Sequence, residues 1–229
     1  MRKYIFACAI ATLIAAPLAA QVTITTGAPA QYVGPLGKDS ELGPIPTVFA
    51  QTFRVPAGTN SLQSFSFYMT NFFGGSGLLL DASVYQFQTD RLTGAALYNG
   101  QFTGTNSSAA VLMKFGSVAL PLNVSLLPAT TYALLFSAAN RFSLTPDGSS
   151  VLLGATLNDA YANGSLFASF ATTTSSLFLT NAFQAAAAPD AAFSATFVST
   201  AVVPEPGSVV LIGTGLLLLG VVNFRRKRA

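Results

Sequence analysis

Hydrophobic and polar residues alternate along the middle of this chain with the period of a β-strand. Phe65, Phe67 and Met69 alternate with less apolar residues, which suits a strand with one buried face. Turn-forming sequences such as Pro146-Asp147-Gly148 separate several runs of this kind. We predict further strands at 48–55, 78–87, 111–120, 131–137, 151–156, 165–170, 176–179 and 191–199. Many short strands at fairly regular spacing predict an all-β fold, either an antiparallel β-sandwich or a jelly roll.

The segment before these strands lacks the alternation. Between residues 27 and 46 the chain holds eight glycines and prolines, which break regular elements. We therefore predict an extended arm or loop over residues 21–46 and a sandwich domain over residues 47–200.

The N-terminal residues have the pattern of a secretory signal peptide. Arg2 and Lys3 precede an apolar stretch from Tyr4 to Leu18, and small residues follow up to Ala20. We predict a signal helix in residues 1–20, cut by signal peptidase after Ala20. Cys8, the one cysteine of the chain, would leave with it.

The C-terminal residues have the pattern of a second targeting signal, which has three parts. Two prolines keep the chain around Glu205 extended, because proline fixes φ and lacks an amide proton. Residues 208–224 carry no charge, and as a helix they would span roughly 25 Å, near the lower limit for crossing a bilayer. A basic cluster then favours a cytoplasmic C-terminus. It consists of Arg225, Arg226, Lys227 and Arg228. The pattern predicts a transmembrane helix at 208–224, and a plain membrane anchor is one interpretation.

This tail resembles the PEP-CTERM sorting signal of bacterial proteins that exosortase handles. The resemblance covers residues 203–229 and rests on the motif Pro204-Glu205-Pro206, the short apolar segment and the basic end, in that order. It implies that Pro204, Glu205 and Pro206 are recognised by a membrane-embedded, transpeptidase-like cysteine enzyme that cuts nearby. It also implies delivery to the cell surface or the extracellular matrix, in a family tied to exopolysaccharide and biofilm biology.

Four segments of the middle region resemble jelly-roll ectodomains of secreted bacterial proteins. They are the segments at 50–58, 62–67, 127–132 and 190–197. This likeness supports the sandwich and implies no function.

Without its two ends, the chain has a different composition. The whole chain of 229 residues has a formal charge of +3, yet between Gln21 and Val203 five basic residues face seven acidic ones, a net charge near −2. The basic ends therefore give no support for binding nucleic acid. The chain has no histidine and, after Cys8, no cysteine. These absences exclude a Ser-His-Asp triad, thiol catalysis, disulfides and zinc sites built from histidine or thiolate.

We therefore expect an exported surface or matrix protein that is not an enzyme and needs no cofactor. A carbohydrate-binding module or adhesin for polysaccharide is the main competing hypothesis, because exposed aromatic rings can stack on sugars and the chain has nineteen Phe and seven Tyr. Three tyrosines near predicted strand ends or loops are the candidates for glycan contact: Tyr85, Tyr98 and Tyr161.

A glycan-active enzyme is the third hypothesis. Two carboxylates meeting in a groove could act as acid and nucleophile. The candidates are Asp81, Asp90, Asp147, Asp159 and Asp190. Oxygen ligands from Asp147-Gly148 and Asn158-Asp159 could alternatively hold a structural Ca²⁺, although ordinary turns are the competing interpretation.

Overall fold

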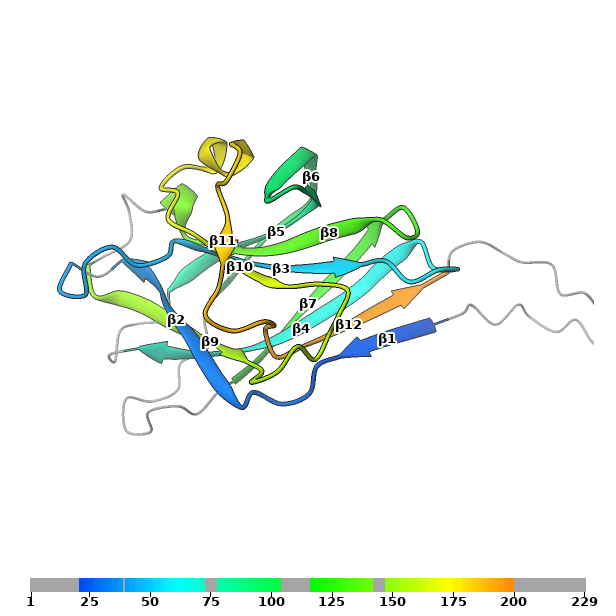
Figure 1. The fold of residues 1–229 in the computed structure, drawn as a ribbon, viewed down its shortest axis with the longest axis horizontal. Coiled ribbons are helices and arrows are strands. Elements are labelled where there is room, and N and C mark those ends of the chain that lie inside the picture. Colours follow the sequence, from blue (N-terminus) through cyan, green and yellow to red (C-terminus); the bar gives the residue numbers. More distant parts are fainter. Residues whose placement is uncertain (1–20, 39, 73–77, 104–115, 142–146, 200–229) are drawn as a thin grey trace, which may run out of the picture. The chain divides into compact units, whose positions relative to one another are not determined.

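Two antiparallel β-sheets packed face to face form the body of the protein (Figure 1). The computed structural model describes residues 21–38, 40–72, 78–103, 116–141 and 147–199, which lie within one compact unit, Ala20–Thr200. The predicted all-β sandwich is confirmed. The finer assignment to a jelly roll stays a prediction.

The first sheet has β4 at its centre. β4 pairs with β7 on one side and with β12 and then β9 on the other, while β1 and β2 lie at the ends of the order β1-β12-β4-β9-β2. The bounds of these strands are β1 Gln21–Thr25, β2 Gln31–Lys38, β4 Ser61–Phe72, β7 Gly116–Ser125, β9 Ser149–Ala155 and β12 Phe193–Val198.

The second sheet has the order β11-β10-β3-β8-β5-β6. Its strands are β3 Val48–Arg54, β5 Leu79–Gln88, β6 Arg91–Thr103, β8 Thr131–Ser137, β10 Leu166–Ser169 and β11 Gln184–Ala185. Two short 3₁₀ helices complete the elements, η1 Ala139–Arg141 and η2 Thr174–Phe178.

The main core fills the space between the two sheets. Phe65, Phe67 and Met69 of β4 are fully buried, as the alternation predicts. On β3 the opposite face is buried too, because a second cluster covers the outside of the second sheet with Leu177 of η2 and Phe183. The middle strands β3 and β8 of the second sheet are therefore enclosed on both faces, which explains their nearly continuous apolar sequence.

The prediction of an arm or loop over residues 21–46 is wrong for two strands. Residues 21–25 form β1, and residues 31–38 form β2 despite their glycines and proline. β2 tolerates them because it is an end strand of its sheet, and its pairing with β9 shifts register between Val33 and Leu36, around Gly34 and Pro35.

Most other predicted strands are confirmed to within a few residues, with one exception. Residues 176–179 are not a strand, since they overlap η2. β6 was not predicted, because most of its residues are exposed and Gly94 and Gly100 interrupt its apolar pattern. The predicted strand at 111–120 corresponds to β7 from Gly116 onwards, and its earlier residues lie outside the described part of the chain.

The two predicted terminal helices also lie outside the described residues. This applies to the signal peptide at 1–20 and to the transmembrane segment at 208–224. Within the described residues, no helix combines the length and the apolar character needed to cross a membrane.

Candidate functional site

The three tyrosines predicted to contact glycans lie in different surroundings and form no common platform. Tyr85 on β5 is only 8 % exposed and packs edge-on against Phe178, with ring centroids 5.5 Å apart. The expectation that Tyr85 is exposed is therefore wrong, because the η2 region covers that face of the second sheet. Tyr98 on β6 is half-buried against the main core. Glycan contact at Tyr98 or Tyr161 stays a prediction.

Tyr161 belongs to a polar network that runs from the surface to the buried Asp190 and fastens a loop to the sandwich. Its hydroxyl donates to the carbonyl oxygen of Arg54 and accepts from the Arg54 amide, each at 3.1 Å. Its own amide donates to Asp190 Oδ2 at 3.0 Å. Its ring meets Phe193 edge-on at 5.7 Å between centroids. Burial raises the pKa of the Tyr161 hydroxyl, so the phenol stays neutral and able to donate.

Asp190 is the centre of this network and is fully buried. Its Oδ1 accepts a hydrogen bond of 3.1 Å from Gln51 Nε2, and Gln51 Oε1 accepts one of 2.7 Å from the Ala191 amide. Burial raises the pKa of Asp190, outweighing the donors that stabilise its charged form. No sequence pattern indicated Gln51 as part of this site, although its polar side chain is fully buried in the middle of β3.

The other candidate aspartates are dispersed. Asp81 on β5 accepts from Asn140 Nδ2 at 3.4 Å, and Asp90 lies in the turn between β5 and β6. Asp159 is exposed, and its negative charge contributes to the raised pKa of Asp190. Asp190 itself is buried and accepts hydrogen bonds from within the fold. Among the described residues, no group of three or more His, Cys, Asp or Glu side chains could hold a metal ion.

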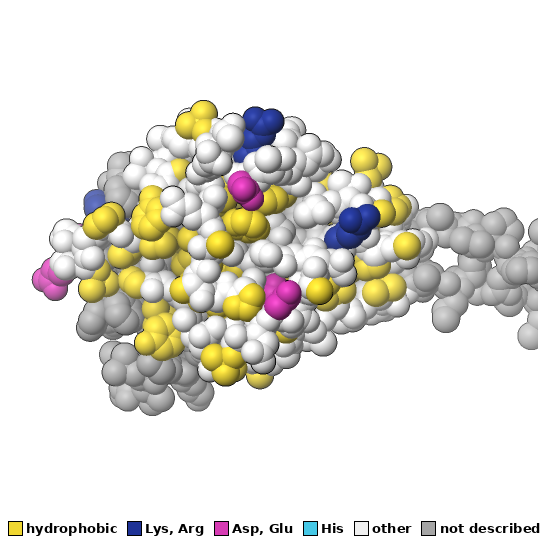
Figure 2. Space-filling model, in the orientation of Figure 1, with side chains coloured by type: hydrophobic (Ala, Val, Ile, Leu, Met, Phe, Trp, Pro, Cys, Tyr) yellow, Lys and Arg dark blue, Asp and Glu magenta, His cyan; other side chains and the backbone are white. Residues whose placement is uncertain are grey.

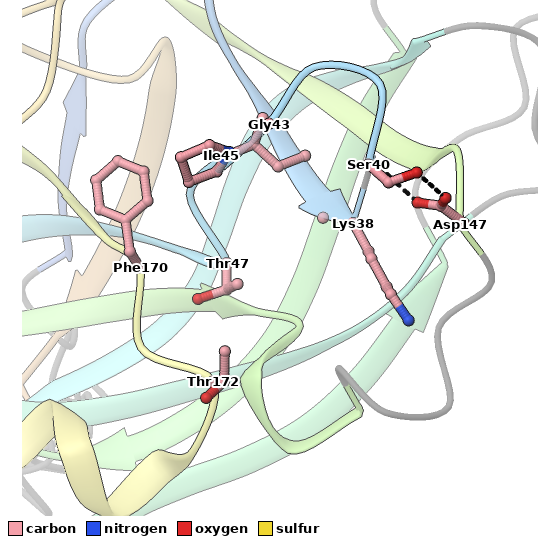
Figure 3. A pocket seen from close by; sticks show the side chains of 10 residues that line it. Lys38, Ser40, Gly43, Ile45, Thr47, Asp147, Phe170 and Thr172 are labelled. Carbon is pink, nitrogen blue, oxygen red and sulfur yellow. Dashed lines mark hydrogen bonds between the residues drawn. The ribbon is translucent and has the colours of Figure 1, made fainter.

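Asp147 lies instead at the edge of a cavity of about 270 Å³ (Figure 3). The cavity is built by three segments that are distant in the sequence: the end of β2 with the loop to β3, the turn before β9, and the chain after β10. The residues that line it are Gly37, Lys38, Ser40, Gly43, Pro44, Ile45, Thr47, Asp147, Phe170 and Thr172.

Hydrogen bonds hold the three segments of the cavity together. Ser40 donates to Asp147 twice, from its amide to Oδ1 at 2.7 Å and from its hydroxyl to Oδ2. Thr47 donates its amide to the Ser169 carbonyl oxygen at 2.9 Å and its hydroxyl to the Ala171 carbonyl oxygen. Gly37 has a φ of +139°, and a Cβ there would lie 2.3 Å from the Ser149 carbonyl oxygen, so this position requires glycine.

The cavity combines one exposed ring with polar groups. Phe170 is 49 % exposed, and Pro44 and Ile45 extend the apolar wall. Hydrogen bonds from Ser40, with a smaller contribution from the positive charge of Lys38, lower the pKa of Asp147, so its carboxylate is charged at neutral pH. Figure 3 shows Lys38 and Thr172 on different sides of the opening. Such a cavity can hold a small ligand that has one apolar face and several hydroxyl groups.

A second cavity of about 310 Å³ lies between β6 and the turn that joins β7 to β8. It is lined by neutral residues, including Leu97, Leu127 and Tyr132, and the Tyr132 hydroxyl already accepts a hydrogen bond from the Leu127 amide. Tyr132 is also buried. This cavity offers neither an exposed ring nor a charged group, and the cavity beside Phe170 is the better candidate for ligand binding.

The predicted sorting residues lie outside the described part of the chain. These are Pro204, Glu205 and Pro206, the cluster Arg225, Arg226, Lys227 and Arg228, and the cleavage position at Ala20.

Comparison with known proteins bears on the tail alone. A search among curated proteins finds no match for this chain. The family model of the PEP-CTERM protein-sorting motif matches residues 202–227, which include all three residues of the Pro-Glu-Pro sequence. The motif implies a protein that is exported and sorted by exosortase to the membrane or cell surface. The chain thus joins a two-sheet β-sandwich body to a C-terminal PEP-CTERM sorting motif.

Proposed function

We propose that this chain is a non-enzymatic protein of the cell surface or extracellular matrix, which exosortase cuts near Pro204-Glu205-Pro206. The PEP-CTERM motif at residues 202–227 is the observation that carries the proposal. The strand β12 ends at Val198, only four residues before the matched region. Cutting near the motif would thus release the folded domain without removing any of its strands.

The side chains of the domain support a role without catalysis. The chain has no histidine, and its one cysteine is in the predicted signal peptide. The buried Asp190 is committed to hydrogen bonds within the fold, and Asp147 is held by Ser40. Figure 2 shows isolated charged side chains among neutral polar and scattered apolar ones on the visible face. A weakly charged surface of this kind suits contact with a hydrated, neutral matrix.

Replacing Glu205 by Ala should block processing, because the variant loses the one carboxylate of the recognition sequence. We expect the Glu205→Ala chain to accumulate uncut in the membrane fraction of its host, measured by immunoblotting against the sandwich domain. Thr200→Ala, which precedes the matched region, is the matched control and should be processed like the wild type. Normal processing of Glu205→Ala would contradict recognition of that carboxylate.

A second function is favoured by the cavity beside Phe170. We propose that it binds a neutral saccharide unit, with one face of the sugar ring on Phe170 and its hydroxyls toward the rim formed by Lys38, Asp147 and Thr172. Sugar rings present C–H groups on a face and hydroxyls around the edge, which matches an exposed ring beside polar groups. The charged Asp147 carboxylate retains acceptor capacity beyond its two bonds to Ser40.

Phe170→Ala should reduce retention on a glycan array or on the host's own extracellular polysaccharide by at least about tenfold, because the stacking surface is lost. Leu179→Ala removes another exposed apolar side chain, outside the cavity, and should bind like the wild type. Binding by Phe170→Ala at wild-type strength would contradict the saccharide site, while leaving the sorting proposal untouched.

A further inference from the structure

β1 is an outer strand that lacks the sequence features which usually prevent a sheet edge from pairing with another chain. Its sequence, Gln-Val-Thr-Ile-Thr, has no charge, proline or glycine. Natural sheet edges are commonly protected by such residues, by register shifts or by short strands. The other outer strands here have them: β2 carries Pro35 and a register shift, β7 carries Pro121, β6 begins at Arg91, and β11 has two residues.

The backbone groups that β1 presents outward can be identified from its pairing with β12. The Thr26 amide donates to the Phe193 carbonyl oxygen at 3.0 Å, in continuation of the register that pairs Gln21 with Val198. Because backbone groups alternate in direction along a strand, residues 22 and 24 also face β12. The amide and carbonyl groups of Gln21, Thr23 and Thr25 therefore point away from the sheet.

The side chains of β1 alternate between exposed and half-buried positions. Gln21, Thr23 and Thr25 are exposed. Val22 and Ile24 are half-buried, and Ile24 packs against the main core beside Ala195, its partner on β12. The outer strand thus leaves the sides of two β-branched apolar residues incompletely covered. Beside them, the outward backbone groups of β1 form no strand pairing within the described part of the chain.

We propose that β1 pairs with β1 of a second copy of this chain, antiparallel and centred on Thr23. A two-fold axis at Thr23 sets Thr23 opposite Thr23 and Gln21 opposite Thr25, so every outward backbone group of the strand meets a partner. The same register sets Val22 opposite Ile24, and each pair covers the apolar side that one copy leaves half-exposed. The first sheets of the two copies become one continuous sheet.

A second copy is favoured over an unrelated strand because β1 is complementary to itself in this register. Two identical edges related by a two-fold axis across the strands pair antiparallel, and the amide of each outward residue then meets a carbonyl oxygen of the partner. In a parallel pair with identical residues side by side, amides would face amides and carbonyl groups would face carbonyl groups. The paired region begins at Gln21, the first residue after the predicted signal-peptidase cut. The proposal goes beyond the sorting function and does not depend on exosortase.

Cysteine cross-linking tests this register directly in the full-length chain in its host. Residues in a hydrogen-bonded antiparallel pair have Cα atoms about 5.5 Å apart, within disulfide range. Thr23→Cys should therefore give a disulfide-linked dimer on a non-reducing gel. Thr25→Cys, the matched control, should not, because two residues 25 would be about 14 Å apart along the strand. Coexpressed Gln21→Cys and Thr25→Cys copies should cross-link to each other.

A charge test covers the case in which cysteine variants fold poorly. Thr23→Lys and Thr23→Glu should each be monomeric by sedimentation of the protein extracted from its host, because like charges would face each other at the two-fold axis. A mixture of the two should form mixed dimers. Gln63→Lys adds the same charge at an exposed position of β4 and should stay dimeric. A monomeric wild type, a dimeric Thr23→Lys, or equal cross-linking at residues 23 and 25 would overturn the proposal.

Discussion

Replacing Asp190 by Ala is expected to destabilise the domain by about 3 kcal/mol, because two donors would each lose a hydrogen bond to a fully buried acceptor. These donors are Gln51 Nε2 and the Tyr161 amide, bonded to Asp190 at 3.1 and 3.0 Å. Urea or thermal unfolding of the purified protein measures the change, and a fall of about 9 °C in melting temperature corresponds to it for a domain of this size.

Asp159→Ala is the matched control for Asp190. It removes a carboxylate that acts on Asp190 through its charge but is itself exposed. Surface substitutions of this kind usually change stability by less than about 0.5 kcal/mol. Equal stability of Asp190→Ala and the wild type would mean that the network does not hold the loop at Tyr161.

The pH dependence of Asp190 has a definite sign. Because burial raises its folded pKa, the folded state binds this proton more tightly than the unfolded state. Its contribution to stability is complete below the unfolded pKa, near 3.9, and is lost as the pH rises through the folded value. Asp190→Asn cannot ionise, so its stability relative to the wild type should improve over that rise. A constant difference between the two from pH 3 to pH 8 would contradict the raised pKa.

Phe67→Ala is expected to cost about 4 kcal/mol, because it removes a large side chain at a point where the two sheets meet. Phe67 on β4 is fully buried, and its ring centroid lies 4.0 Å from that of Phe136 on β8 and 5.3 Å from that of Phe102 on β6. The cavity left behind would remove contacts with the opposite sheet that neighbouring rings cannot restore without moving.

Unfolding in urea measures this loss, with Phe170→Ala as the matched control. Phe170 is 49 % exposed, so its truncation should change stability by less than about 1 kcal/mol. Similar losses from Phe67→Ala and Phe170→Ala would contradict a core centred between the sheets. A stable Phe170→Ala also ensures that its glycan binding can be interpreted.

The alternation of apolar residues was enough to predict the sandwich and most of its strands. On β4 the period of two directly reports one buried face, so Phe65, Phe67 and Met69 were placed correctly. β2 escaped prediction because an end strand with a register shift accommodates Gly34 and Pro35, which would stop a central strand. The segment 176–179 was wrongly predicted as a strand, because Leu177 and Phe178 cover the outside of the second sheet from a 3₁₀ helix.

The candidate site was harder to predict than the fold, because its residues meet only through long-range pairing. Ser40 and Asp147 are 107 positions apart in the sequence, and Phe170 joins them only because β10 pairs with β3. Nothing local distinguishes Phe170 from the core phenylalanines. Tyr85 was misplaced for the same reason, since the segment that covers it follows about 90 positions later. The sorting motif, in contrast, is a contiguous signal and was readable directly.

Intact-mass measurement of the protein recovered from its native host tests the central claim most directly. We expect a polypeptide that begins at Gln21 and ends near Pro204-Glu205-Pro206, so that its mass lacks both the signal peptide and the apolar and basic tail. A mass that retains Arg225 to Ala229 would contradict cleavage at the sorting motif and would make the tail an ordinary membrane anchor.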